Sequence, residues 1–150
     1  YTTLSVHLST LTFEGFIKVI FTNIVPRVSE TDGVGHINNV FVPIWFEAGR
    51  REIFRIFSPN LDFVNWKLAL VKVTVEYVDQ LYLAENVEVR TGIQKIGNSS
   101  FTIREEIFQT NRLCAKGEAV YVNYNFQENK SETISNEIRD KLQSIKFVDN

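Results

Sequence analysis

Residues 30–39, which read Glu-Thr-Asp-Gly-Val-Gly-His-Ile-Asn-Asn, bring together side chains that can do chemistry. Asp32 and His36 flank a segment with two glycines, which let the backbone turn sharply. Asn38 and Asn39 follow shortly after His36. A helix is predicted to start here, and its first turn offers unpaired N–H groups and a positive dipole end. A carbonyl oxygen that becomes an oxyanion could be held there, with Asp32 close by.

The segment after this stretch has the apolar spacing of three and four residues that is typical of a helix, from about Asn39 to Phe57. Pro43 is tolerated only in the first turn, so the helix is expected to start close to Asn39, with Asn38 and Asn39 as caps. The segment is apolar around much of its circumference, which predicts that most of it is buried. Residues 58–60, Ser-Pro-Asn, are expected to end it.

The remaining chain reads mainly as strands. Residues 16–28 are rich in β-branched and aromatic residues, and four later runs alternate apolar with other residues. Their short connections predict antiparallel pairing, and residues 135–145 predict a C-terminal helix. The expected class is therefore α+β, with a curved antiparallel sheet of about five strands wrapped round one long central helix. The alternating positions are Ala69, Val71, Val73, Val75 and Tyr77, then Val87, Val89 and Ile93 around Thr91, then Phe101, Ile103 and Ile107 around Glu105, then Leu113, Ala115, Ala119 and Tyr121.

The bulk properties fit one domain of 150 residues, with residues 1–16 as an N-terminal arm or extra strand and residues 17–150 as the domain itself. The formal net charge is −2 with both signs scattered, which argues against nucleic acid as a partner. Cys114 is the single cysteine, which favours a reducing, cytoplasmic location. No apolar run is long enough to cross a bilayer, so no membrane partner is expected. Open sheet edges predict pairing with a second copy.

Three short motifs and two strands together resemble the hotdog-fold acyl-CoA thioesterases of the 4-hydroxybenzoyl-CoA thioesterase-like family. The resemblance covers roughly residues 20–145, and the run from the aspartate to the paired asparagines is its most specific part. The two strand segments are similar to the second and fourth strands of the family. The matching segments are residues 27–32, 35–39 and 46–50 for the motifs, and 75–77 and 96–101 for the strands.

This resemblance implies a hotdog fold and hydrolysis of an acyl thioester, acyl-CoA or acyl-carrier protein, without a metal or redox cofactor; CoA is part of the substrate. It also implies a homodimer whose sheets join edge to edge, with active sites at the subunit boundary, and a further pairing into a homotetramer. The catalytic aspartate of the family falls on Asp32, and its oxyanion donor falls on the backbone N–H of Asn39. Related acyl-carrier-protein thioesterases use Asp-x-Asn-x-His; here Asp32 and His36 fit, but Val34 replaces the asparagine. The departure argues against a carrier-protein substrate.

Each candidate residue also has a purely structural interpretation. Asp32 is predicted to activate water or to attack the thioester carbonyl itself, and the alternative is a turn-forming aspartate. His36 either hydrogen-bonds the carbonyl or orients Asp32, or else satisfies backbone groups at the helix start. Gly35 and Asn38 are expected to border the substrate near the oxyanion donor. Glu47 is a second acid/base candidate.

For Glu47 the structural alternative is an intrahelical ion pair with Arg50 or Arg51. Ser99 and Ser100 are expected near the pantetheine arm by resemblance, and turn chemistry explains them equally well.

At the level of the whole protein, the alternative to an enzyme is a non-catalytic hotdog module that binds acyl-CoA for regulation. Such a module is expected to lack the carboxylate at position 32, which this chain retains.

Overall fold

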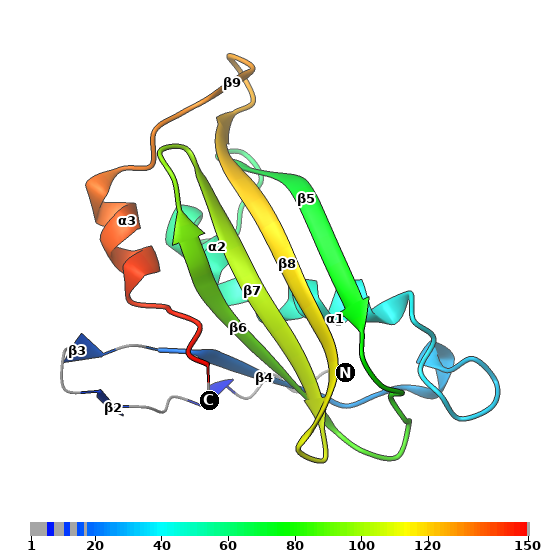
Figure 1. Cartoon of the computed structure of the whole chain (residues 1–150). Helices are drawn as coiled ribbons and strands as arrows, with labels where there is room; N and C mark the ends of the chain where they lie inside the picture. The colour runs from blue at the N-terminus through cyan, green and yellow to red at the C-terminus, as the bar shows by residue number, and fades with distance from the viewer. Residues whose placement is uncertain (1–5, 8–10, 13–14, 17, 150) are drawn as a thin grey trace.

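The computed structural model describes residues 6–7, 11–12, 15–16 and 18–149, in which an antiparallel sheet curls around two helices (Figure 1). The order of strands in the main sheet is β1-β4-β6-β7-β8-β5, and β9 pairs with the end of β8. The short strands are β1 (Val6–His7), β2 (Leu11–Thr12), β3 (Gly15–Phe16) and β9 (Lys130–Ser131). The longer strands are β4 (Ile20–Ile24), β5 (Leu68–Tyr77), β6 (Val87–Ile96), β7 (Ser100–Gln109) and β8 (Arg112–Asn125). The helices are the 3-10 turn η1 (Val28–Glu30), α1 (Phe41–Gly49), α2 (Arg51–Phe57) and α3 (Asn136–Gln143).

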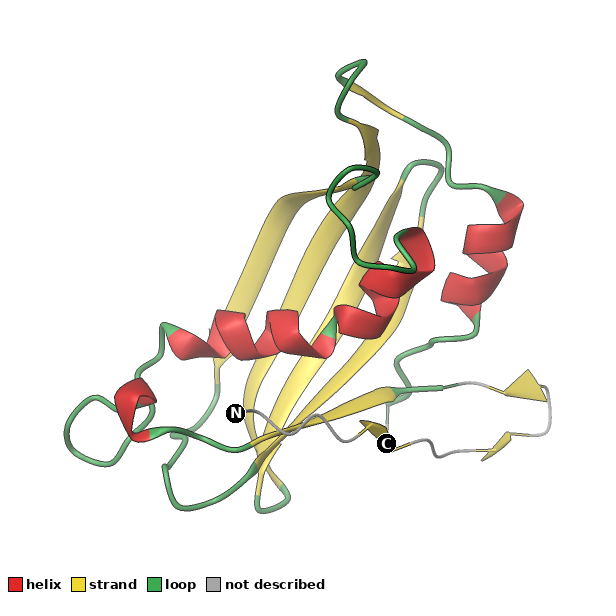
Figure 2. Ribbon diagram, turned by 180° about the vertical axis from the view of Figure 1, so that it is seen from behind, coloured by secondary structure: helices red, strands yellow, loops and turns green. Residues whose placement is uncertain are grey.

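The expected single central helix is two helices, which lie end to end across the concave face of the sheet (Figure 2). The first begins at Phe41, two residues later than expected, and its N-cap is Val40, whose side chain makes no capping bond. The break falls at Arg50, whose N–H donates to Glu47 O three residues back at 3.0 Å. A tighter turn of this kind, which ends one helix and starts the next, is a 3-10 feature that periodicity does not reveal.

The helices bury their apolar side against the inner face of the sheet in two clusters. Two glycines let the layers approach closely. A Cβ on Gly117 of β8 would lie 2.8 Å from the ring of Phe46, and a Cβ on Gly49 of α1 would lie 2.6 Å from Thr91 Oγ1. Larger residues at either place would push the helix away from the sheet. The first cluster includes Ile53, Leu68, Ile103, Ile134 and Leu142, and the second includes Ile24, Trp45, Phe46, Val89 and Ala115.

Strand β5 departs from the regular alternation that the sequence predicts. Its register against β8 shifts between Leu70 and Lys72, so that Val71 is an extra, bulged residue. The prediction that Ala69 shares the face of Val73 is therefore wrong, because Ala69 lies opposite Val122, on the other face of the sheet from Tyr121 and Ala119. Leu70 instead lies opposite Tyr121 and faces the helices, as Val73 does opposite the buried Ala119.

The C-terminal helix is confirmed as α3, which packs beside α2 and β6. Ser135 caps it, because its Oγ accepts the Ile138 N–H at 3.3 Å. Of the predicted N-terminal arm, Val6–His7 pairs with β4, and two further two-residue strands pair with each other. Residues 1–5, 8–10 and 13–14 of that arm lie outside the described residues. Within the described ranges, no helix is both long and apolar enough to span a membrane.

Candidate functional site

Glu30 anchors the loop that carries the candidate catalytic residues. It is the last residue of η1, and its carboxyl group is buried. Oε1 accepts the Arg27 N–H at 2.8 Å, Oε2 accepts the indole N–H of Trp45 at 2.8 Å, and its carbonyl accepts the Asn38 N–H at 2.8 Å. Both ends of the loop and helix α1 are thereby fixed to one residue.

Asp32 and His36 face each other across the tip of this loop. The Asp32 N–H donates to His36 O at 2.9 Å, and Asp32 Oδ1 accepts the Val34 N–H at 3.0 Å in an Asx turn. Gly33 and Gly35 both have φ near +90°, a conformation that other residues rarely adopt, so the tight tip needs glycine. His36 Nδ1 lies 3.7 Å from Asp32 Oδ2, and both side chains are more than one third exposed. The turn role of Asp32 is therefore present, and one of its oxygens is left for other contacts.

The loop is braced from the other side by the segment before β6. Ile37 N–H donates to Leu81 O at 2.8 Å, and the ring of Tyr82 meets the ring of His36 edge-on, with centroids 5.2 Å apart. The buried Gln109 at the end of β7 holds this segment through both amide atoms. Its Oε1 accepts the Tyr82 N–H at 2.9 Å, and its Nε2 donates to Tyr82 O at 2.7 Å and to Glu85 O at 2.9 Å.

The backbone N–H of Asn39 is free to bind a ligand. Among the described residues it has no hydrogen-bond partner, whereas the Asn38 N–H is bonded to Glu30 O and the Val40 N–H to Asn38 Oδ1 at 3.1 Å. Asn38 thus caps the helix start through its side chain, and no such bond is seen for the Asn39 side chain. Asn39 borders a cavity of about 480 Å³ beside β5. The other lining residues include Ile37, Val42, Tyr77, Leu81 and Cys114.

Glu47 lies apart from Asp32, on the exposed side of α1. The ion pair considered for it is not formed, because Arg50 bonds to Glu105 instead, and no ion pair of Glu47 is seen with Arg51 in the described part of the chain. Glu47 lines a second, larger groove of about 740 Å³ between α1, α2 and the start of β5. The groove is otherwise mainly apolar; Ile44, Ala48, Phe54, Trp66, Leu68 and Leu70 are among its walls.

Ser99 and Ser100 lie at the opposite end of the sheet from the loop of Asp32. Ser100 begins β7, and Gln109, which contacts the segment beside His36, ends it. The strand is ten residues long, so its two ends lie roughly 30 Å apart. Within one chain the two serines therefore do not meet Asp32, and their placement near a pantetheine arm stays a prediction.

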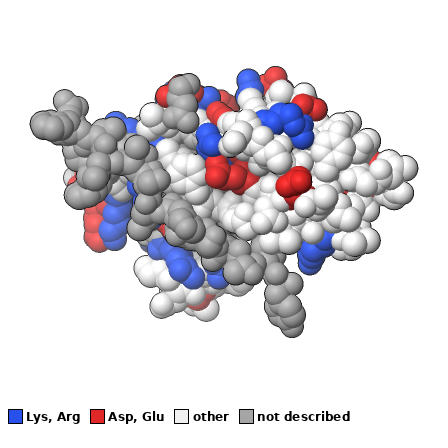
Figure 3. Space-filling model, turned by 90° about the horizontal axis from the view of Figure 1, so that it is seen from below, with Lys and Arg blue, Asp and Glu red and all other residues white. Residues whose placement is uncertain are grey.

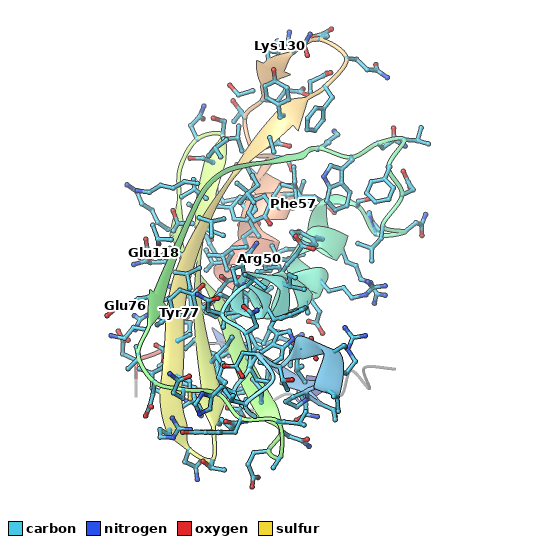
Figure 4. The ribbon with its side chains drawn as sticks, turned by 90° about the vertical axis from the view of Figure 1, so that its right-hand side faces the viewer. Arg50, Phe57, Glu76, Tyr77, Glu118 and Lys130 are labelled. Carbon is cyan, nitrogen blue, oxygen red and sulfur yellow. The ribbon has the colours of Figure 1, made fainter. Side chains whose placement is uncertain are left out.

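A buried ion pair that sequence reasoning missed lies at the break between the helices, at Arg50, which is labelled in Figure 4. Arg50 forms a two-bond contact with Glu105, from Nε to Oε1 and from Nη2 to Oε2 at 2.9 Å, and its Nη1 donates to the hydroxyl of Tyr121 at 3.0 Å. Burial raises the pKa of Glu105 above its ordinary value, and the bonds and charge of Arg50 offset that only in part. Burial also raises the pKa of Tyr121.

A signal for three of these buried polar residues was present in the sequence. Glu105 and Gln109 occupy inward positions of an alternating strand, where an apolar residue is the norm, and Arg50 interrupts an apolar helix. A buried polar group needs a partner, so such positions mark internal braces. Glu30 gave no comparable signal, because the turn that buries it has no periodicity.

Charged side chains of both signs lie side by side on the face of the molecule shown in Figure 3. In the described ranges, no group of three or more His, Cys, Asp or Glu residues is arranged to hold a metal ion. The groups of this loop that are available to react with a ligand or to bind one are the Asp32 carboxylate, the His36 imidazole and the Asn39 N–H. A carboxylate and an unpaired N–H on the same loop suit attack on a carbonyl, with the N–H stabilising the oxyanion.

Residues 26–142 match the model of the thioesterase-like superfamily. Among known structures, a predicted thioesterase from Bacillus stearothermophilus is 52% identical, with a TM-score of 0.85 over 88% of this chain and 99% of that one. A thioesterase from Thermus thermophilus, complexed with coenzyme A and Zn, is 21% identical, with a TM-score of 0.73 over 82% and 96% of the two chains. The 1,4-dihydroxy-2-naphthoyl-CoA thioesterase Slr0204 from Synechocystis is 16% identical, with a TM-score of 0.72 over 83% and 96%. No curated protein sequence matches the chain significantly.

Proposed function

This chain belongs to the thioesterase-like superfamily and has its hotdog fold, and we propose that this thioester hydrolase cleaves acyl-CoA to a free acid and CoA. The observation that supports the proposal is that one braced loop carries both the Asp32 carboxylate and the free N–H of Asn39. A thioester is already activated, because sulfur is a weak π-donor and a thiolate leaves well. The proposed reaction therefore needs only a base or nucleophile and an oxyanion donor, with neither a metal nor a redox cofactor.

In the proposed reaction, Asp32 either removes a proton from the attacking water or attacks the carbonyl carbon to give a mixed anhydride that water then cleaves. In both routes the C–S bond breaks and the thiolate of CoA takes up a proton. The Asn39 N–H holds the oxyanion, which is worth about 10²–10³ in rate for one donor. His36, 3.7 Å from Asp32, can orient the carboxylate.

The proposed working unit is a homodimer joined through β5. This strand ends the sheet, and apolar side chains along it are exposed: Leu70, Val71, Val73 and Tyr77. An open, apolar edge strand favours pairing with another strand. If two copies of β5 pair antiparallel over their full length, Leu68 of one lies opposite Tyr77 of the other. The groove that contains Glu47 would then face the Asn39 of the other copy.

Such a dimer would give each active site walls from both copies. The groove beside Leu68 and Leu70 would receive the acyl group, and Ser99 and Ser100 lie at the same end of the sheet, toward which the CoA arm would run. Glu47 would then border the acyl group rather than act inside its own chain. Further pairing into a homotetramer and a cytoplasmic location stay predictions.

The test is thiol release from aryl and medium-chain acyl-CoAs, comparing Asp32→Asn with the unaltered protein. Asparagine retains an oxygen for the Val34 N–H, so the turn survives while the negative charge is lost. We expect turnover to fall by about 10²–10⁴-fold, the contribution of a general base. Asp62→Asn is the matched control, because Asp62 Oδ1 likewise accepts a backbone N–H, that of Asn65, on an exposed loop.

Two outcomes would contradict the proposal. Turnover by Asp32→Asn equal to that of the unaltered protein would leave Asp32 with its turn role alone. Binding of acyl-CoA by the unaltered protein, with no thiol released from any substrate, would instead favour the non-catalytic binding module.

A further inference from the structure

Tyr77, the last residue of β5, makes a contact with the helix start that the sheet itself does not require. Its hydroxyl donates to the carbonyl oxygen of Asn39 at 3.0 Å. Its backbone lies opposite Ala115, whose side chain is buried, so the ring stands on the face of the sheet that carries the helices. Figure 4 shows Tyr77 toward the lower part of β5, beside Glu76. Tyr77 and Asn39 both line the cavity of about 480 Å³.

This contact completes a set of bonds around one peptide group. The peptide before it is held by the bond from the Asn38 N–H to Glu30 O at 2.8 Å. The peptide after it is held by two bonds to Asn39 O, from the Tyr77 hydroxyl and, at 3.3 Å, from the Val42 N–H. The carbonyl of the peptide between them, that of Asn38, accepts the Phe41 N–H at 3.0 Å. The N–H of this central peptide, that of Asn39, is the free donor.

The Tyr77 hydroxyl does not need Asn39 for its own satisfaction. In a single copy the side chain is 51% exposed, so water could serve the hydroxyl equally well, and a neutral bond at such a place adds little to the stability of the fold. Its consequence is positional: beside the longer bond from the Val42 N–H, it is the contact that ties the Asn39 carbonyl to β5, and with it the backbone of the residue whose N–H is free. A donor fixed before the reaction needs no reorganisation when the oxyanion forms.

We propose that Tyr77 is a positioning residue of the active site, which orients the oxyanion-binding N–H of Asn39 through its carbonyl. The inference rests on the proposed function, in which that N–H binds the oxyanion. Because the interaction matters in the transition state and not in the ground state, its loss lowers kcat and leaves KM nearly unchanged.

The decisive variant is Tyr77→Phe, which removes one oxygen and retains the ring. We expect kcat for acyl-CoA hydrolysis to fall roughly 3- to 10-fold, the range that corresponds to one neutral hydrogen bond. KM is expected to stay within about twofold, because the variant loses no contact with the substrate in the ground state. Tyr124→Phe is the matched control; that ring lies at the far end of β8 and no hydrogen bond of its hydroxyl is seen in the described residues. A rise in KM with unchanged kcat, or equal losses in both variants, would overturn the inference.

A second measurement does not depend on turnover. ¹⁵N relaxation of the backbone amides should show increased mobility at residues 38–40 in Tyr77→Phe, with the amides of β7 and β8 unchanged. An unchanged Asn39 amide would overturn the inference even if kcat fell. If the unaltered protein cleaves no thioester, the proposed function fails, and the relaxation data alone decide whether Tyr77 fixes residue 39.

Discussion

Removing one member of the buried Arg50–Glu105 pair should destabilise the protein far more than removing both. The side chains are 2% and 0% exposed, and they share two hydrogen bonds, so neither charge can turn to water when the other is lost. For Arg50→Leu or Glu105→Leu alone we expect a loss of about 3–5 kcal/mol in the free energy of unfolding. That is a large share of the roughly 5–15 kcal/mol typical of one domain.

The double variant Arg50→Leu/Glu105→Leu carries no buried charge. Its main remaining defect is the hydroxyl of Tyr121, which loses the Arg50 donor, at a cost of about 1–3 kcal/mol. The double variant should therefore be at least as stable as either single variant. The loss in the double variant should be smaller than the sum of the two single losses by about 3 kcal/mol or more.

The assay is urea unfolding followed by tryptophan fluorescence at neutral pH and one fixed protein concentration, since association would shift the midpoint. Glu88→Gln is the control, because Glu88 pairs with Arg90 on the exposed face of β6 and its loss should cost less than about 1 kcal/mol. If the loss of unfolding free energy in the double variant equals the sum of the two single losses, the argument is refuted that removing one partner leaves the other charge buried and unpaired.

Two further outcomes follow from the environment of single residues. Glu30→Gln should lower the free energy of unfolding by about 1–3 kcal/mol in urea titrations and reduce turnover. Arg27 and Trp45 donate to different oxygens of Glu30, and the amide nitrogen that replaces one of them cannot accept a hydrogen bond; stability equal to that of the unaltered protein would contradict this. Cys114 should react with a thiol reagent only after denaturation, because it is 1% exposed and burial raises its pKa, which depletes the thiolate; rapid labelling of the native protein would argue against its burial.

The sequence predicted the layers of the fold well because period and burial agree in most of the chain. In β7, Phe101, Ile103 and Ile107 all face the helices, as their alternation predicts. Strand β5 is the exception. Its bulge at Val71 adds one residue to the count, and no local pattern distinguishes a bulged valine from a paired one.

The candidate site, too, could be predicted from the sequence only in part. The tight loop around Asp32 could be predicted, since glycines and an aspartate at this spacing have a local conformational meaning. The more distant supports of the loop could not, because Gln109 and Tyr77 reach it from strands that become its neighbours only when the sheet curls. Long-range contacts of this kind depend on the tertiary arrangement, which periodicity does not report.

The tip of the loop that carries Asp32 is tied to the rest of the protein mainly through main-chain atoms. Asp32, Ile37 and Asn38 donate through their amides, and Gly35 and His36 accept through their carbonyls. Side chains at its tip can therefore be exchanged without releasing it, and Val34, which is 75% exposed, has the most freedom. Position 34 is accordingly a natural starting point for directed evolution: substrate preference could be diversified there, by Val34→Asn first, while the frame that aims the chemistry stays intact.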